Sequence, residues 1–369
     1  MSFLACNPTV FVIGDSYEIL VYAEAPGLFS LRVGDELYYE ENSGVLSSER
    51  LFVKIRVPQA ALDAEGSYTV IYRKTILRRA YFSQFEDALT ETFAFRPVPS
   101  EGDIHIYYTA DVHYHFGTAE RTLTYFGDEL HLLIANGDLG EVEKESDYLD
   151  VCRFLGNVTG GTIPVVMVRG NHDTRGHLSE RFTDYFPADG KKTYFTFTLP
   201  ALSGIVLDCG EDKWDNHEEY GGGHNGELVY NGTNVFERYR REETKFLRAL
   251  EIKKDRPILA ISHICPSMTT KNKGDIFDIE RETYAEWNRE LARLGGDVML
   301  TGHLHKTFVL ERGDERATTE NPYPVIVGSS MTYSGDTIVG TAITLRRDGL
   351  TYKFTDQDLA VLEEGEIKF

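Results

Sequence analysis

The sequence of residues 163–173 is IPVVMVRGNHD, an apolar run that ends abruptly in a polar turn. A short apolar run bounded by a turn is typical of a buried strand. Four more apolar runs, at 104–109, 130–135, 257–262 and 297–301, also end in polar residues. Because parallel strands of an α/β sheet end at one edge, where ligands bind, the polar side chains after these runs are predicted to form one site. They are Asp111, His113, Asp138, Asn171, His263, His303 and His305.

The chain beyond residue 103 alternates between strand and helix patterns. Helical stretches around 145–156, 236–252 and 281–294 separate the apolar runs, which include a further run at 203–208. From Lys306 to Phe369 the pattern returns to strands. This alternation predicts a layered α/β domain over residues 103–369.

The first part of the chain has a different pattern. Up to about residue 96 it consists of short β-rich runs separated by turn residues such as Gly14-Asp15 and Pro26-Gly27. This spacing predicts an all-β sandwich of about seven strands over residues 1–98, which resembles an immunoglobulin or fibronectin type III domain. Tyr68, just before the strand at 69–73, is expected to form a tyrosine corner by bonding to upstream backbone. The prolines at 97 and 99 mark a linker.

Composition narrows the range of partners and locations. The chain has 369 residues and a formal net charge of −21, so a nucleic-acid polymer and an anionic membrane are disfavoured as partners. Its four cysteines are widely spaced and are expected to be reduced. The first basic residue is Arg32, and no apolar run approaches the ~20 residues that span a bilayer. We therefore predict a cytoplasmic location.

The seven polar residues at the predicted strand ends have the chemistry of a metal site. Carboxylate, imidazole and amide donors without a thiolate suit borderline divalent ions of the first transition row. In two-metal hydrolases a carboxylate bridges the ions and a shared water becomes a hydroxide nucleophile, and Asp138 is the natural bridge. The two carboxylates of Asp111 and Asp138 leave two divalent ions with a net positive charge, which suits a phosphate group.

Together these blocks resemble the signature of the calcineurin-like metallophosphoesterase superfamily over roughly residues 103–356. The matching blocks, in order, are Asp111-Val-His113, Gly137-Asp138, Gly170-Asn171-His172-Asp173, His263 and Gly302-His303-Leu-His305. The resemblance implies a two-sheet α/β/β/α sandwich and a dinuclear centre of Mn, Fe or Zn. It also implies that Asp111, His113 and His305 bind the first ion, that Asn171, His263 and His303 bind the second, and that Asp138 bridges them.

The same resemblance implies a role for His172 other than metal binding. His172 becomes the candidate general acid or charge stabiliser at the leaving oxygen, with Asp173 orienting its ring. A purely structural role for His172 is the alternative.

The layout of a β-sandwich before the catalytic domain is similar to that of purple acid phosphatases. In those enzymes a tyrosine three residues after the bridging aspartate binds ferric iron, whereas this chain has Glu141 there, which argues for a colourless site.

Three further residues are candidates for substrate binding: Arg175, His115 and His224. Each has a simpler alternative as a surface or loop residue. The polar, glycine-rich segment 211–234 is proposed to cover the site, with a flexible solvent loop as the equal alternative. The basic run Arg238–Arg241 is expected on the solvated face of a helix.

These residues predict hydrolysis of a small phosphate ester, with a phosphomonoester favoured. One alternative is a phosphodiesterase that acts on nucleotide or glycerophospholipid diesters. A second, from another class, is an inactive binding or scaffold protein, but no predicted ligand is missing from the sequence. Nuclease activity is disfavoured by the acidic charge.

Overall fold

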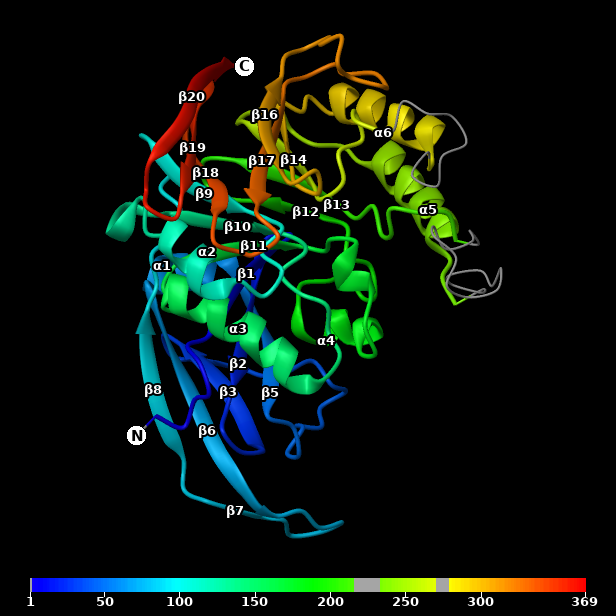
Figure 1. Cartoon of the computed structure of the whole chain (residues 1–369). Helices are drawn as coiled ribbons and strands as arrows, with labels where there is room; N and C mark the ends of the chain where they lie inside the picture. Colours follow the sequence, from blue (N-terminus) through cyan, green and yellow to red (C-terminus); the bar gives the residue numbers. More distant parts are fainter. Residues whose placement is uncertain (1, 216–232, 270–278) are drawn as a thin grey trace.

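The computed structural model describes residues 2–215, 233–269 and 279–369. In these ranges, two packed β-sheets share an apolar interior, and helices cover the two outer faces (Figure 1). The predicted fold class is confirmed: β-structure comes first, and a two-sheet α/β sandwich follows.

Six of the predicted apolar runs form the parallel strands that position the site. The first sheet contains β9 (Ile104–Thr109), β10 (Leu132–Asn136) and β11 (Pro164–Val168). The second contains β13 (Ser203–Leu207), β14 (Ile258–Ser262) and β15 (Val298–Thr301). Side chains alternate between the faces of these strands: Val166 lies in the interior between the sheets, whereas Val165 packs under the helices.

Helices form the outer layers. The first sheet is covered by α2 (Phe116–Thr122) and α3 (Glu145–Thr159), and the second by α5 (Phe236–Ala249) and α6 (Arg281–Arg293). Two shorter helices are α1 (Gln59–Glu65) and α4 (Phe182–Tyr185). Helix α3 begins where Asp147 accepts backbone hydrogen bonds from residues 143 and 144, both at 3.0 Å, and it ends at Gly160 in the left-handed region.

The remaining strands of the α/β domain extend the two sheets, and some of them connect one sheet to the other. They are β12 (Phe195–Thr198), β16 (Lys306–Leu310), β17 (Val325–Met331), β18 (Ile338–Arg346), β19 (Gly349–Asp356) and β20 (Val361–Lys368). Strand β17 pairs with β15 of the second sheet and with β18, which pairs with β9 of the first. On the other side, Gly14 bridges to Phe197 of β12. The sandwich is therefore linked along both of its sides.

The N-terminal strands divide between two sheets. They are β1 (Thr9–Ile13), β2 (Ser16–Tyr22), β3 (Gly27–Val33), β4 (Glu36–Tyr38), β5 (Phe52–Pro58), β6 (Ser67–Leu77), β7 (Gln84–Phe85) and β8 (Leu89–Ala94). Strands β3, β4, β6, β7 and β8 form a separate sheet, seen at the bottom of Figure 1. Strands β1, β2 and β5 instead extend the first sheet, because β1 pairs in parallel with β11. The β-ladder thus crosses the predicted division at residue 98.

The predicted tyrosine corner at Tyr68 is wrong. The buried Tyr68 hydroxyl donates to the carbonyl oxygen of Gly161, at 2.9 Å, rather than to upstream backbone. Gly161 has φ +71°, and a Cβ there would lie 2.8 Å from that hydroxyl, so glycine suits both the backbone and the contact. The tyrosine therefore ties the N-terminal strands to the loop before β11.

Helix α5 is more buried than its basic sequence suggests. The prediction that Arg238–Arg241 lies on a solvated face is wrong for Arg240, which is fully buried and donates from Nε to the carbonyl oxygen of Cys209 at 2.7 Å. Glu243, one turn later, is also fully buried and accepts the backbone N–H of Asp208 at 2.9 Å. Burial and the nearby Asp208 carboxylate raise the pKa of Glu243 well above its usual value, although Arg240 and Arg169 oppose this shift.

The raised pKa of Glu243 predicts a pH-dependent loss of stability. The folded state keeps a proton that the unfolded state releases, so stability falls by about 1.4 kcal/mol per pH unit between the unfolded-state and folded-state pKa values. The glutamine in Glu243→Gln stays neutral at every pH. The melting temperature of this variant minus that of wild type should therefore increase as pH rises from 5 to 8. Glu242→Gln, at the exposed neighbouring position, should show no such gain. A constant difference between Glu243→Gln and wild type across this range would contradict the assignment.

Two features predicted from composition concern the thiols and membrane spans. All four cysteines are free, and Cys152, Cys209 and Cys265 are buried. Among the helices in the described residues, none has the length and apolar character needed to cross a bilayer. The cytoplasmic location stays a prediction.

Candidate metal centre

Five loops at the carboxyl ends of the parallel strands meet at one edge of the sandwich. Backbone hydrogen bonds join these loops directly: Asp111 N–H donates to Gly137 O at 3.1 Å, and Gly302 N–H donates to His263 O at 3.0 Å. The Asp111 carboxylate accepts the backbone N–H of His303 at 3.0 and 3.1 Å. Residues that are almost two hundred positions apart are thereby brought into one cluster, as the strand ends predicted.

The backbone at these strand ends is strained. Asp111, Asp138 and His303 have φ values of 55°, 54° and 68°, in the left-handed region that non-glycine residues rarely adopt. Such a conformation costs roughly 1–3 kcal/mol per residue and is typical of functional sites. Gly170 also has no room for a side chain, since a Cβ there would lie 2.2 Å from Asp138 Oδ1. The side chains of the cluster are therefore positioned by backbone conformations that are energetically unfavourable.

The first group of metal donors consists of Asp111, His113 and His305. His305 Nε2 lies 3.4 Å from Asp111 Oδ1 and 3.3 Å from His113 Nε2. His113 Nε2 is also 3.9 Å from Asp138 Oδ2, which belongs to the second group. The three side chains therefore present their donor atoms to one small volume beside Asp138.

The second group centres on Asp138, His263 and His303. His263 Nε2 lies 3.1 Å from Asp138 Oδ2, and its Nδ1 hydrogen-bonds to the carbonyl oxygen of Asn136 at 2.6 Å. This second bond fixes the orientation of the ring and leaves Nε2 to face the cluster. Asn171 Oδ1 adds an oxygen donor, 3.0 Å from His303 Nδ1 and 3.3 Å from Asp138 Oδ2.

The charges of the cluster fit divalent cations. Asp111, Asp138 and Asn171 are almost completely buried, and the Asn171 side-chain oxygen faces other atoms that carry lone pairs. Burial opposes protonation of His263, but the Asp138 and Asp111 carboxylates outweigh it and raise the pKa of His263 to about 10. Burial and the nearby His263 lower the pKa of His303 to about 4. A cation among these donors supplies the positive charge that the buried carboxylates otherwise take from a protonated histidine.

His172 forms a further group of possible metal donors with His113 and Asp138, and its ring is held from two sides. Its Nδ1 is 2.6 Å from Glu141 Oε1, and its Nε2 is 2.9 Å from Arg175 Nη1. The ring meets the His113 ring edge-on, with centroids 4.7 Å apart. His172 therefore sits next to the first donor group while its own nitrogens contact an acid and a guanidinium. Sequence reasoning treated Glu141 only as a replacement for tyrosine and missed this contact.

The predicted role of Asp173 in orienting His172 is corrected by the structure. The Asp173 carboxylate accepts the backbone N–H groups of Asp138 at 2.9 Å and of Gly170 at 2.8 Å. Burial and the neighbouring Asp138 raise the pKa of Asp173 to about 7. Asp173 therefore fixes the two loops that carry Asp138 and Asn171, while Glu141 contacts the His172 ring.

Arg175 connects His172 to an acidic pair after β13. Its guanidinium bonds to both carboxylate oxygens of Glu211, at 2.6 and 2.8 Å, and to Asp212 Oδ1 at 3.2 Å. Asp212 Oδ2 in turn lies 3.9 Å from His303 Nε2. Sequence reasoning did not single out Glu211 and Asp212, although their place just beyond a parallel strand was the available signal. Arg175 is thus at the site, and these acids engage its guanidinium.

The other two substrate-binding candidates have different outcomes. The His115 ring packs against Gly335 in the turn between β17 and β18, where a Cβ would lie 2.0 Å from His115 Nδ1. His224 lies outside the described residues, as does most of the segment 211–234 that was expected to cover the site. Of that segment, Glu211 and Asp212 lie beside the donor cluster.

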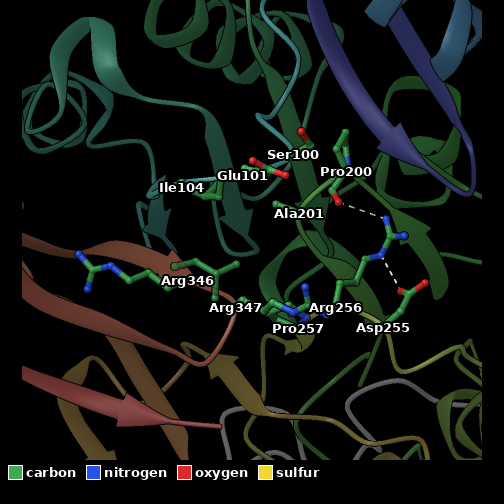
Figure 2. Close-up of a pocket in the computed structure, with 12 residues that line it drawn as sticks. Ser100, Glu101, Ile104, Pro200, Ala201, Asp255, Arg256, Pro257, Arg346 and Arg347 are labelled. Atoms are coloured by element: carbon green, nitrogen blue, oxygen red, sulfur yellow. Dashed lines mark hydrogen bonds and ion pairs between the residues drawn. The ribbon is translucent and has the colours of Figure 1, made fainter.

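A cavity lies at the opposite ends of the parallel strands from the donor cluster. The cavity has a volume of about 430 Å³, and Figure 2 shows Arg256 and Pro200 in its lining. Arg256 donates to the carbonyl oxygens of Leu199 at 2.8 Å and of Pro200 at 3.3 Å. Arg256 also pairs with Asp255 at 2.9 Å. The described lining includes none of the predicted site residues. This cavity is therefore separate from the described metal-donor cluster.

Buried oxygen and nitrogen donors at the carboxyl edge of a two-sheet α/β sandwich define the class of metal-dependent phosphoesterases. The sequence model of the calcineurin-like phosphoesterase family matches residues 104–307, more than half of the chain, and the chain belongs to this family. It is accordingly a hydrolase that acts on phosphate esters, and the family implies a dinuclear metal centre.

Two solved structures share the fold over nearly the whole chain. One is the purple acid phosphatase PPD1 from yellow lupin (Lupinus luteus) seeds, with 10% identity and a TM-score of 0.60 over 98% of this chain and 74% of that one. The other is PhoD, with 11% identity and a TM-score of 0.58 over 98% of this chain and 88% of that one. No match to a curated protein was found. The similarity to both solved structures includes the N-terminal strands and confirms the predicted layout.

Proposed function

We propose that the seven donor side chains hold two divalent ions. One ion would be bound by Asp111, His113 and His305 and the other by Asn171, His263 and His303, with Asp138 between them. The donor atoms of Asp111, His113 and His305 lie close together, as do those of Asp138, His263 and His303, which supports this division; His172 also lies near His113 and Asp138 and is given another role below. Asp138 suits the shared position because its Oδ2 lies 3.1 Å from His263 Nε2 in one group and 3.9 Å from His113 Nε2 in the other.

The reaction we propose is hydrolysis of a small phosphate ester, with a phosphomonoester favoured. When bound, two divalent ions polarise the phosphoryl group and make water nucleophilic near neutral pH. The observation that carries this proposal is the position of His172 beside the donor cluster, with Glu141 and Arg175 on its ring. In this position His172 gives a proton to the departing ester oxygen or stabilises its negative charge, and Glu141 keeps the His172 ring in place.

We further propose that the ions are Mn, Fe(II) or Zn in a colourless site. The described donors are carboxylate, imidazole and amide groups, a set that suits these ions. Glu141 occupies the position at which a tyrosine would bind ferric iron, and its carboxylate is engaged with His172.

We also assign catalysis to residues 103–369 and treat residues 1–98 as a second domain. All seven proposed donors lie in the first of these ranges. The N-terminal strands contribute to the catalytic sheet through β1 without supplying a donor to the site. This assignment makes the N-terminal strands a support for the catalytic domain.

A comparison of two chromogenic esters tests the reaction. Protein loaded with Mn²⁺ should hydrolyse p-nitrophenyl phosphate faster than bis(p-nitrophenyl) phosphate, lose activity in EDTA and regain it when Mn²⁺ is returned. Circular dichroism before and after EDTA separates metal loss from unfolding. Faster cleavage of the diester would favour the phosphodiesterase alternative. Cleavage of neither ester with Mn²⁺, Fe²⁺ or Zn²⁺ would overturn the proposal and favour a scaffold.

A further inference from the structure

An apolar cavity of about 440 Å³ opens beside the second donor group. The described residues that line it are Asp212, Ile264, Met268, Thr269, Ile279, Tyr284, His303 and Leu304. His303 is one of the proposed metal donors, and Asp212 is bound by Arg175, which also contacts His172. The cavity therefore shares His303 with the donor groups and lies next to Asp212, which contacts the Arg175 side chain.

The apolar wall is fixed to the proposed metal donors by the chain itself. Ile264 directly follows His263, and Leu304 lies between His303 and His305. Ile264 is buried in the apolar cluster that covers the second sheet, and Leu304 packs against that cluster. Because these wall residues are adjacent in sequence to donor residues and are packed in the core, the wall lies at a fixed distance from the donor groups. A phosphate bound at the donors would therefore lie at a fixed distance from the cavity.

The chemistry of the wall differs from that of the donor cluster. Ile264, Met268, Ile279 and Leu304 offer hydrocarbon or thioether surface, while His303 and Asp212 are at the polar side. Tyr284 is fully buried, and its hydroxyl has no hydrogen-bond partner among the described residues. An apolar cavity holds water poorly, because water needs two to four polar partners there. A phosphate group alone gains nothing from such a wall.

We propose that this cavity receives the apolar organic group, alkyl or aryl, of the phosphate ester. The inference rests on the proposed hydrolysis and narrows the substrate to esters whose phosphate lies at the donor groups while the hydrocarbon lies against Ile264, Met268 and Leu304. The volume lies within the roughly 300–1,000 Å³ range of small-molecule sites, so a ring or a short chain fits. A polar sugar would gain less than a hydrocarbon group from contact with Ile264, Met268 and Leu304.

A chain-length series tests the proposal. Methyl, butyl and hexyl phosphate have leaving groups of nearly equal basicity, so differences in kcat/KM report contacts of the chain. Each buried methylene should raise kcat/KM by up to about fourfold until the cavity is full. A flat series, with all three esters hydrolysed equally well, would overturn the proposal while leaving phosphate-ester hydrolysis intact.

A variant pair locates the effect in the cavity. Met268→Gln keeps the side-chain length but places an amide in the apolar wall, so the hexyl-to-methyl ratio of kcat/KM should fall toward one. Leu362→Gln introduces the same amide on the exposed strand β20 and should preserve the wild-type ratio. An unchanged ratio in Met268→Gln would place the chain elsewhere and overturn the assignment to this cavity.

A binding measurement separates this inference from the proposed hydrolysis. Methyl-, butyl- and hexylphosphonate are not hydrolysed, and their affinity for Mn²⁺-loaded protein can be measured by calorimetry. Affinity that rises with chain length supports the cavity even if no ester is cleaved, in which case only the hydrolysis proposal fails. Equal affinity for the three phosphonates would overturn the cavity proposal.

Discussion

Asp138→Asn should lower kcat by roughly a thousandfold and reduce the bound metal, because the change removes the charge shared by both donor groups. Asp138 Oδ2 lies within 4 Å of His263 and His113, one from each group. Its Oδ1 also accepts the backbone N–H of His172 at 2.8 Å. One substitution therefore weakens both metal positions and the anchor of the neighbouring histidine. Metal analysis after gel filtration and steady-state kinetics with p-nitrophenyl phosphate measure the two effects.

Asp103→Asn is the matched control for this variant. Asp103 lies just before β9, at the opposite end of the strand from the site, and pairs with Arg346 at the surface. It should retain wild-type kcat and metal content. If the Asp138→Asn variant keeps wild-type turnover, the assignment of Asp138 to the metal centre is wrong.

His172→Ala should lower kcat by roughly a hundredfold while the protein keeps its metal. General acid catalysis contributes about 10²–10⁴-fold, and His172 belongs to neither proposed set of three ligands. The loss should be larger for phenyl phosphate than for p-nitrophenyl phosphate, because the nitrophenolate leaves readily without a proton. Single-substrate kinetics with both esters, together with metal analysis, check this expectation.

Glu141→Gln tests whether the carboxylate beside His172 supports the role of that histidine. The amide keeps the shape of the side chain next to His172 Nδ1 but loses the charge, so we expect about a tenfold loss of kcat with little change in KM. As for His172→Ala, the loss should be larger for phenyl phosphate. Equal losses for both esters in His172→Ala would assign His172 a structural role instead.

Much of the site could be predicted because strand ends are local features of the sequence. The run at 104–109 predicted β9 to the residue, and the donors that follow each strand come together because parallel strands share an edge. The residue types at those ends were sufficient to indicate metal chemistry. No long-range information was needed beyond the alternation of strands and helices.

Contacts that depend on side-chain direction were not predictable in this way. Whether Glu141 or Asp173 contacts the His172 ring depends on the path of two loops, and both acids are close in sequence to proposed donors. Arg240 looks like a surface residue by its type, yet the carbonyl groups of Cys209 and Glu211 bind its guanidinium inside the fold. The partner of Tyr68 is 93 residues away, which no local pattern encodes.

The pairing of β1 with β11 joins the N-terminal strands to the catalytic domain in one sheet. Val10 and Phe11 align with Pro164 and Val165, and the same strand β11 continues into Gly170, Asn171 and His172. The N-terminal strands are therefore connected by one hydrogen-bonded ladder to the strand that leads into the loop with Asn171 and His172. Cutting the chain near residue 98 would also leave the edge of β11 bare, which is a template for aggregation. We therefore expect the N-terminal strands to support the loop that carries Asn171 and His172.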